Sequence, residues 1–144
     1  MPKEIDWKQE MVCIDGKLYP CGTSVAMSLI GGKWKMVIIY HLIEGKLRYN
    51  ELRKQLPTVT ERTLSLQLKQ LESDGFIKRT VYTRKPPLKV DYELTAFGKT
   101  LLPVLEAIGK WGEDLAKERG ELVDLASFKS RRPRGRGVQA PDHL

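Results

Sequence analysis

The segment from Thr60 to Gly75 constrains the fold of this 144-residue chain more than any other stretch. Within it, residues 61–74 carry apolar side chains at helical spacing, which predicts an amphipathic helix with one buried side. The residues that define this side are Leu64, Leu68 and Leu71. Thr60 is a good N-cap, although Thr63 stands where a full capping box has Glu. Gly75 stands where a left-handed C-cap residue is expected, so local sequence sets both ends of the helix.

A shorter helix is expected just before this one. It begins at Tyr49 or Asn50, carries Leu52 and Leu56 on one side, and ends at Pro57. A three-residue turn then leads into the longer helix. This arrangement predicts a helix-turn-helix, in which the first helix braces a phosphate backbone and the second lies in the major groove of DNA.

Two strands are expected directly after the helix-turn-helix. Residues 76–84 are rich in Ile, Thr, Val and Tyr, and residues 90–94 alternate apolar and polar side chains. Residues 85–89 between them contain Pro86 and Pro87, which lack the amide hydrogen that a sheet requires. They must therefore project as a basic, stiffened loop, and the hairpin has the character of a wing.

The rest of the ordered chain is expected to be helical. Helices are predicted from Thr23 or Ser24 to residue 30 and over residues 33–43, with Leu47–Tyr49 forming no more than a short strand. Thr95 caps a final helix over residues 96–119, in which Pro103 introduces a bend or a break.

These elements predict a mainly α fold with a small β-hairpin (α+β), namely a winged helix-turn-helix flanked by N- and C-terminal helices. Residues 1–20 are expected to be an N-terminal arm, and residues 21–119 the winged helix-turn-helix domain with its C-terminal helix. Residues 120–144 have the Arg-, Gly- and Pro-rich composition of a basic, disordered tail.

Charge is unevenly distributed along the chain, whose net charge is +7. Residues 46–89 carry eleven basic and four acidic side chains, whereas residues 90–128 carry four basic and eight acidic ones. A basic block beside an acidic one predicts that one face binds a polyanion while another serves a different purpose.

The polar side of the longer helix is the predicted reading surface for double-stranded DNA. Arg and Gln form bidentate hydrogen bonds to guanine and adenine edges, Thr binds phosphate, and a Leu methyl group contacts a thymine methyl. The candidate residues are Thr60, Arg62, Thr63, Leu66, Gln67, Lys69 and Gln70. Considered alone, the same residues would also suit an ordinary solvated helix face.

The wing supplies three further candidates, which are Arg84, Lys85 and Lys89. Their long cationic side chains suit phosphate or minor-groove contact better than sequence readout. The alternative is a charged hairpin tip that only discourages edge-to-edge aggregation.

Several classes of protein are disfavoured. The cysteines Cys13 and Cys21 and the histidines His41 and His143 are too few for a disulfide scaffold or a zinc cluster, so neither metal nor cofactor is expected. No apolar run approaches the roughly 20 residues that cross a bilayer, and the polar N-terminus lacks a signal-peptide core, which suggests a cytoplasmic protein without membrane association. A thiol enzyme would need a resolving Cys or a His close to Cys21 in the sequence, so no enzymatic activity is expected.

The sequence resembles the HxlR-type transcriptional regulators, winged-helix relatives of the MarR group, from Cys21 to about Trp111. The strings that carry the resemblance are GGKW (31–34), RYNEL (48–52), LSLQLKQLESDG (64–75), PPLKVDYELT (86–95) and the closing Trp111-Gly112. The family consists of homodimeric DNA-binding repressors or activators, whose N-terminal and last helices form the dimer interface.

For this chain the resemblance implies that the N- and C-terminal helices are dimerisation helices and that the homodimer reads an inverted-repeat operator. Its half-sites would lie about 34 Å apart, or a multiple of that distance. The implied interface residues of the last helix are Leu101, Leu105, Ile108, Trp111 and Leu115. Without the resemblance, this apolar stripe could equally pack within one monomer.

Cys21 matches the family's characteristic N-terminal cysteine, although Gly22 replaces the proline that often follows it. Some members of the family use this cysteine to sense oxidants or electrophiles. A position just before a helix start favours the thiolate, but a quiet, buried cysteine is the competing interpretation. A Cys13–Cys21 pairing has no support from spacing. A small-molecule effector and a nonspecific or architectural winged-helix module also stay open as alternatives.

Overall fold

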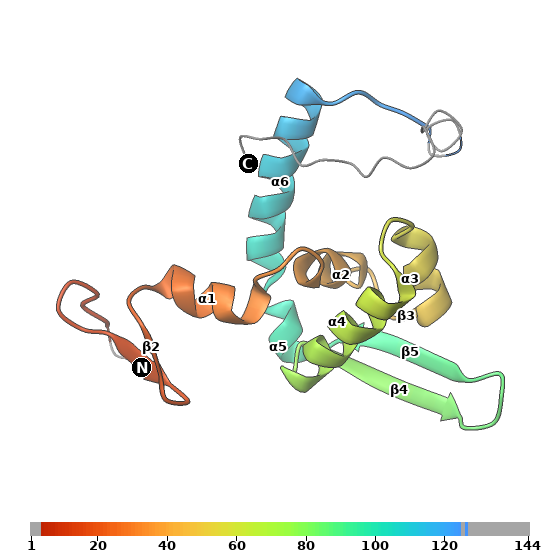
Figure 1. The fold of residues 1–144 in the computed structure, drawn as a ribbon, viewed down its shortest axis with the longest axis horizontal. Helices are drawn as coiled ribbons and strands as arrows, with labels where there is room; N and C mark the ends of the chain where they lie inside the picture. The colour runs from red at the N-terminus through yellow and green to blue at the C-terminus, as the bar shows by residue number, and fades with distance from the viewer. Residues whose placement is uncertain (1–3, 125, 127–144) are drawn as a thin grey trace. The chain divides into compact units, whose positions relative to one another are not determined.

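The computed structural model describes residues 4–124 and 126, which Figure 1 shows in colour. The chain divides into two compact units, Met1–Glu106 and Ala107–Leu144. The helices are α1 (Gly22–Ile30), α2 (Lys35–His41), α3 (Tyr49–Gln55), α4 (Glu61–Ser73), α5 (Ala96–Lys99) and α6 (Leu102–Arg119). The strands are β1 (Val12–Ile14), β2 (Lys17–Tyr19), β3 (Leu47–Arg48), β4 (Ile77–Thr83) and β5 (Lys89–Leu94). Most of the expected tail, residues 120–144, lies outside the described residues.

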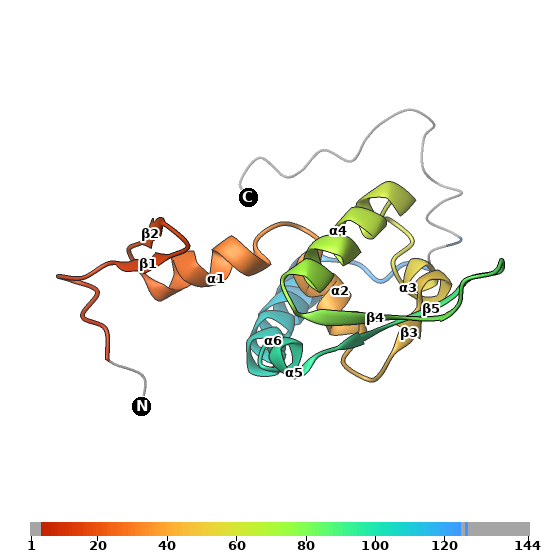
Figure 2. The ribbon, with the colours of Figure 1, turned by 90° about the horizontal axis from the view of Figure 1, so that it is seen from below.

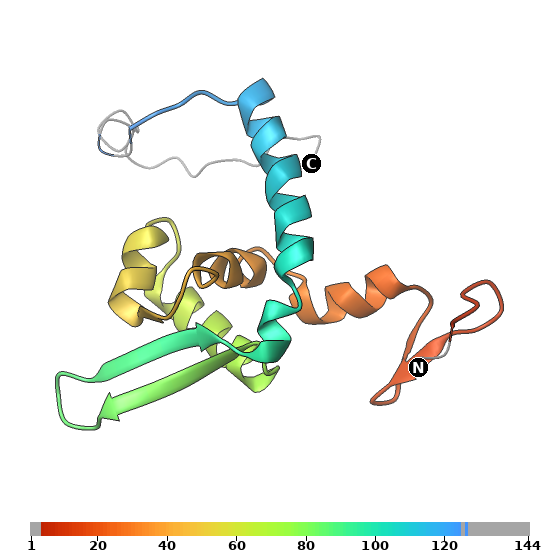
Figure 3. The ribbon, with the colours of Figure 1, turned by 180° about the vertical axis from the view of Figure 1, so that it is seen from behind.

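The helix-turn-helix and the wing are both present, as predicted. Helices α3 and α4 are joined by a short turn, and β4 and β5 project as a hairpin after α4 (Figure 3). Strand β3 adds to β5, which gives a three-stranded antiparallel sheet of order β3-β5-β4. Helix α4 lies in a layer next to this sheet (Figure 2) and contacts β4. The prediction of a winged helix-turn-helix is therefore confirmed.

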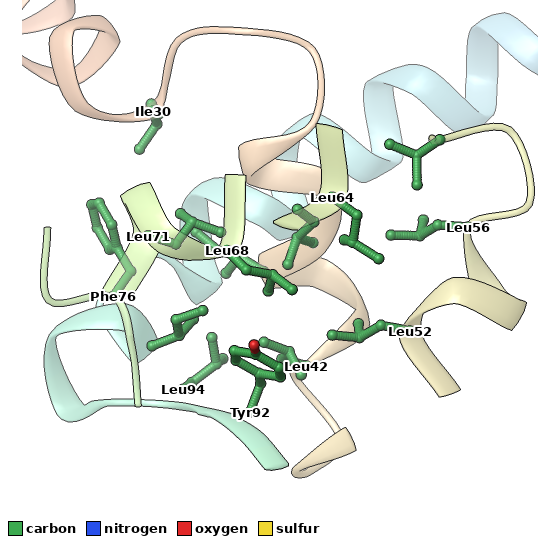
Figure 4. Packing of buried hydrophobic residues seen from close by; sticks show 14 of the residues in the cluster. Ile30, Leu42, Leu52, Leu56, Leu64, Leu68, Leu71, Phe76, Tyr92 and Leu94 are labelled. Atoms are coloured by element: carbon green, nitrogen blue, oxygen red, sulfur yellow. The ribbon is translucent and has the colours of Figure 1, made fainter. Parts of the chain in front are cut away.

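One hydrophobic core joins the helices to the sheet in the first unit (Figure 4). It includes Ile38, Ile39 and Leu42 of α2, Leu52 of α3, Leu64, Leu68 and Leu71 of α4, Tyr92 and Leu94 of β5, and Leu105 at the start of α6. Burying a side chain of this size stabilises a fold by roughly 1.5–3 kcal/mol. The leucines predicted to form the inner side of α4 are all in this core, so α4 is held in one rotational setting.

The boundaries of α4 agree with the sequence prediction. The Thr63 N–H donates to the Thr60 hydroxyl oxygen at 3.1 Å, so Thr60 is the N-cap. Gly75 has a φ of 82°, the left-handed conformation that glycine adopts without strain. Thr95 is likewise the N-cap of α5, and the break expected near Pro103 falls between α5 and α6.

Some helix starts and one wing boundary were predicted wrongly. The N-cap of α1 is Cys21, not Thr23 or Ser24, because the thiol itself accepts the hydrogen bond that a hydroxyl would accept. Helix α2 begins at Lys35, two residues later than expected. Lys89 belongs to β5, because it pairs with Thr83 across the wing instead of lying in the loop.

The expected N-terminal arm contains a second, two-stranded sheet, formed by β1 and β2. Asp15 and Gly16 both have positive φ values, 49° and 80°, at the turn between these strands. Asp-Gly is a preferred pair for such tight hairpin turns. This dipeptide was the sequence signal for the hairpin, and it was overlooked.

Gly98 in α5 is expected to tolerate no larger side chain. It is buried, and a Cβ atom added there would clash with the carbonyl oxygen of Phe76. We expect Gly98→Ala to lower the free energy of unfolding by about 1–3 kcal/mol, the usual effect of overpacking, as measured by urea denaturation. Gly109→Ala in α6, where an added Cβ meets nothing within 4 Å, is the control and should raise it by about 0.4–1 kcal/mol. Equal effects of the two changes would contradict the argument.

Candidate nucleic-acid interface

Polar contacts at the edge of the core fix the crossing of α3 and α4. The Tyr49 hydroxyl lies 3.2 Å from Ser65 Oγ and 3.4 Å from the carbonyl oxygen of Glu61, both in the first half of α4. Arg53 of α3 also forms an ion pair with Glu61. These contacts add to the leucine packing and orient the N-terminal half of α4, the part that enters the groove in proteins of this architecture.

The outward side of α4 carries the exposed candidates for DNA contact. Leu66 is 52% exposed even though it is apolar. Arg62, Lys69 and Gln70 are also exposed, as is the cap residue Thr60. An exposed leucine flanked by cations and an amide suits contact with the edges of bases.

Two of the predicted reading residues are less available. Thr63 and Gln67 lie on the flank of α4 and are half-buried. The Thr63 hydroxyl oxygen also accepts a hydrogen bond from the Thr60 hydroxyl, at 2.9 Å. The two threonine side chains therefore bond to each other at the start of the helix.

The positive charge of this region does not come from α4 itself, which holds two basic and two acidic residues. Three cations of residues 46–89 are held by acidic partners. Lys46 and Arg48 lie 4.0 and 3.6 Å from the Asp91 carboxylate, and Arg53 pairs with Glu61. The hydrogen bond from Lys46 to the Tyr82 hydroxyl and the nearby Asp91 charge raise the pKa of Lys46 above its ordinary value.

The other eight cations of residues 46–89 make no ion pair with any described residue, and all are exposed. They are Lys54 on α3, Arg62 and Lys69 on α4, Lys78 and Arg79 on β4, and Arg84, Lys85 and Lys89 at the wing. The peptide bond between Pro86 and Pro87 at the wing tip is cis. Most of the cations without an ion pair thus lie on α4 and along the wing, where a DNA backbone would meet them.

Cys21 occupies an exposed position with a specific hydrogen-bonding environment. Its Sγ accepts a hydrogen bond from the Ser24 N–H at 3.4 Å, while its own N–H donates to Ser24 Oγ. The hydrogen bond from the Ser24 backbone, followed by that from the Ser24 side chain, lowers the pKa of the Cys21 thiol from its ordinary value. Cys13 is also exposed, in β1, and both thiols are free. The interpretation of Cys21 as a buried cysteine is therefore wrong.

The apolar stripe proposed for dimerisation does not act as one surface. Leu105 is 5% exposed in the core of the first unit, and Leu101 packs against that core, so the inclusion of Leu105 in an interface is wrong. In contrast, Ile108 and Trp111 are exposed, Trp111 to 68%, and Leu115 is half-buried. Helix α1 carries further exposed apolar side chains that were not singled out from the sequence, those of Met27 and Leu29.

Among residues 4–124 and 126, no helix has the length and apolar character that spanning a membrane requires. Nor do their His, Cys, Asp and Glu side chains form a group of three that could hold a metal ion.

Comparison with known proteins places this geometry in context. The chain is 53% identical over 106 residues to the HTH-type transcriptional regulator YdeP of Bacillus subtilis, a match that covers 74% of this chain and 81% of YdeP. It is similar to the redox regulator HypR in its oxidized form, with 47% identity and a TM-score of 0.61 over 65% of this chain and 96% of HypR. It is also similar to the reduced form of the transcriptional regulator YodB from B. subtilis, with 31% identity and a TM-score of 0.55 over 72% of this chain and 98% of YodB.

The family comparison agrees with these similarities. The family model described as HxlR-like helix-turn-helix matches residues 29–120, which include both helices of the helix-turn-helix and the whole wing. The matched proteins are transcriptional regulators, a role that is not enzymatic. The chain belongs to the HxlR-like helix-turn-helix family and has the DNA-binding fold of its transcriptional regulators.

Proposed function

We propose that this protein is a sequence-specific transcriptional regulator that binds an inverted-repeat DNA operator as a homodimer. The observation that carries the proposal is the outward side of α4, where Arg62, Leu66 and Lys69 are exposed while three leucines hold the opposite side in the core. The cationic wing lies next in the chain, and its side chains suit the DNA backbone or the minor groove.

Self-association is supported by apolar side chains that are exposed in the described part of the chain. Ile108 and Trp111 are exposed on α6, and Met27 and Leu29 are exposed on α1. Exposed apolar side chains that gather on a helix are typical of surfaces that bind another protein. In a two-fold dimer the two α4 helices would read half-sites about 34 Å apart, or a multiple of that distance.

Redox control through Cys21 is the third part of the proposal. An exposed thiol whose pKa is lowered by hydrogen bonds is more nucleophilic at neutral pH than an ordinary cysteine. HypR is described as a redox regulator in oxidized and reduced forms, and YodB in diamide-treated and quinone-bound forms. We infer that oxidants or electrophiles modify Cys21 and thereby change the affinity for DNA.

A nonspecific or architectural module is the alternative, and selection of bound DNA from a random pool separates the two. An enriched inverted repeat is expected. We expect Arg62→Ala to weaken binding to the selected operator by about 1–3 kcal/mol and to relax the preference at one position of each half-site, because a bidentate base contact is lost. Titrations of labelled operator and repeated selection measure both effects. Lys17→Ala in β2 removes the same charge outside the helix-turn-helix and should change neither. Absence of any enriched sequence would contradict specific readout.

The dimer can be tested at its exposed tryptophan. We expect Trp111→Glu to convert the wild-type dimer into monomers at micromolar concentration, because a buried apolar contact would be replaced by two unpaired carboxylates. Sedimentation velocity measures the mass, and circular dichroism checks the helix content. Glu118→Lys, a charge reversal at another exposed position of α6, serves as the control and should stay dimeric. A monomeric wild-type protein would overturn this part of the proposal.

The pH dependence of thiol alkylation tests the state of Cys21. In a Cys13→Ser background, the rate of reaction with iodoacetamide should rise with pH and reach its plateau at a lower pH than that of N-acetylcysteine, because a lowered pKa yields thiolate earlier. Ser24→Ala should move the curve part of the way to higher pH, since the backbone N–H still donates to the sulfur.

The regulatory step requires a DNA-binding measurement. Peroxide treatment should change operator affinity in the Cys13→Ser variant and leave a Cys21→Ser variant unaffected. Mass spectrometry after treatment reports whether Cys21 carries the modification. Unmodified Cys21 with unchanged affinity would remove the redox switch from the proposal without affecting DNA readout.

A further inference from the structure

A cavity of about 460 Å³ opens between the helix-turn-helix and the wing. The elements that line it come from three parts of the chain, namely the start of α3, the first half of α4, and the strands and turn of the wing. Its polar and basic lining residues include Tyr49, Asn50, Ser65, Arg79 and Lys89, with Leu88 beside them. Acidic side chains are not among the residues that line it.

The register of the sheet places Arg79 on the side of β4 that faces the helices. Arg79 is the cross-strand partner of Tyr92, and directly opposite residues of an antiparallel pair point to the same face. Tyr92 is 8% exposed and lies in the core between the sheet and the helices (Figure 4). The guanidinium of Arg79 therefore belongs to the cavity face, whereas the neighbouring Lys78, which pairs with Glu93, lies on the other face.

The cations around this cavity differ in how their charge is balanced. Arg48 also lines it, but its Nε lies 3.6 Å from the Asp91 carboxylate. Arg79, on the cavity face, makes no ion pair with the described residues, so its positive charge has no counter-charge there. Lys89 also lines the cavity, but alternation along β5 places its side chain on the face of Asp91 and Glu93. An unpaired guanidinium in a concave site attracts an anion, and its forked donors suit the oxygens of a phosphate.

Neutral hydrogen-bonding groups complete the site. The hydroxyls of Tyr49 and Ser65 lie 3.2 Å apart and bond to each other at its helical wall. The side chain of Asn50 is exposed beside them and offers an amide donor. A phosphodiester carries one charge and two free oxygens, which matches a site made of one unpaired cation and a few neutral donors.

The position of the cavity indicates the source of the phosphate. Ser65 lies on the flank of α4 that faces Tyr49, beside Leu66 on the outward side. A helix lying in the major groove has the DNA backbone along its flank, at the edge of the groove. A strand that passes from the groove filled by α4 toward the wing would therefore cross this cavity.

We propose that this cavity binds one phosphodiester of the DNA backbone in each half-site, held by Arg79 and oriented by Asn50. This assignment rests on the DNA binding proposed above. Phosphate contacts set the register of a protein on the duplex without reading sequence. This phosphate site would thus position α4 and the wing relative to the same segment of the DNA backbone.

The dependence of operator binding on salt concentration tests whether the cavity binds a backbone phosphate. Each neutralised phosphate contributes about −0.9 to the slope of log K against log salt. We expect Arg79→Gln to make the slope shallower by about 0.9 and to weaken operator and nonspecific DNA alike, which leaves the specificity ratio unchanged. Lys78→Gln is the matched control, with the same loss of charge on the other face of the same strand, and its slope should stay close to that of the wild type.

Further variants test whether the charge of the Arg79 side chain causes the change in slope. Arg79→Lys restores the charge and should restore the slope, which a merely structural role of the arginine would not predict. Should Arg79→Gln lower the melting temperature, Arg79→Met, which keeps the apolar stem of the side chain, provides the second measurement of the slope. A wild-type slope in both Arg79→Gln and Arg79→Met overturns the phosphate site while the proposed function stands.

Two outcomes separate the remaining explanations. A wild-type protein that binds no DNA overturns the proposed function itself. Inorganic phosphate is the probe for a free-anion site. A phosphate-dependent rise in melting temperature that Arg79→Gln abolishes, together with unchanged DNA binding by that variant, would assign the cavity to a free anion and overturn the DNA assignment.

Discussion

The packing of three leucines on one side of α4 is the constraint on which the rest of the structure depends. Leu64, Leu68 and Leu71 are almost completely buried, each contributing roughly 1.5–3 kcal/mol, and they leave α4 one rotational setting. That setting turns Leu66 outward, where its methyl groups can contact a partner. The contacts of Tyr49 and Arg53 with the start of α4 then fix the crossing angle at the edge of the same interface. The hydrophobic core thus determines which polar residues face a ligand.

Local sequence signals predicted much of the fold. The predictions failed where a capping residue was of an unusual type or where tertiary packing decided whether a side chain is buried. Thr60 and Gly75 mark the ends of α4 because capping involves only neighbouring residues. Cys21 was not recognised as an N-cap because sulfur is an uncommon acceptor in that position. Leu105 shares the apolar period of Ile108, but periodicity does not distinguish a core that belongs to the monomer from a surface that a second chain covers.

The candidate site shows the same division between what sequence and structure supply. The basic character of residues 46–89 was evident from composition, and helical spacing predicted that Arg62 and Lys69 are exposed. Composition does not show that Asp91, from the acidic block, neutralises Lys46 and Arg48. The position of Arg79 also required the strand register, because its partner Tyr92 identifies the face on which it lies. A total charge therefore predicts the kind of partner, whereas ion pairing and register decide which cations are available to it.

The location of Cys21 restricts how a change at sulfur can reach DNA under the proposed function. The thiol accepts its hydrogen bond within the first turn of α1, and Ile30, at the far end of that helix, is its one buried residue. The residues proposed to read DNA lie on α4, a separate helix. A sulfur that gains oxygen or a substituent loses the thiolate character that makes it a good acceptor for the Ser24 N–H. The first effect of modification is therefore on the cap of α1, whose exposed Met27 and Leu29 belong to the surface proposed for self-association. Control of DNA binding would then act through the arrangement of two protomers, while the reading side chains of each protomer keep their structure.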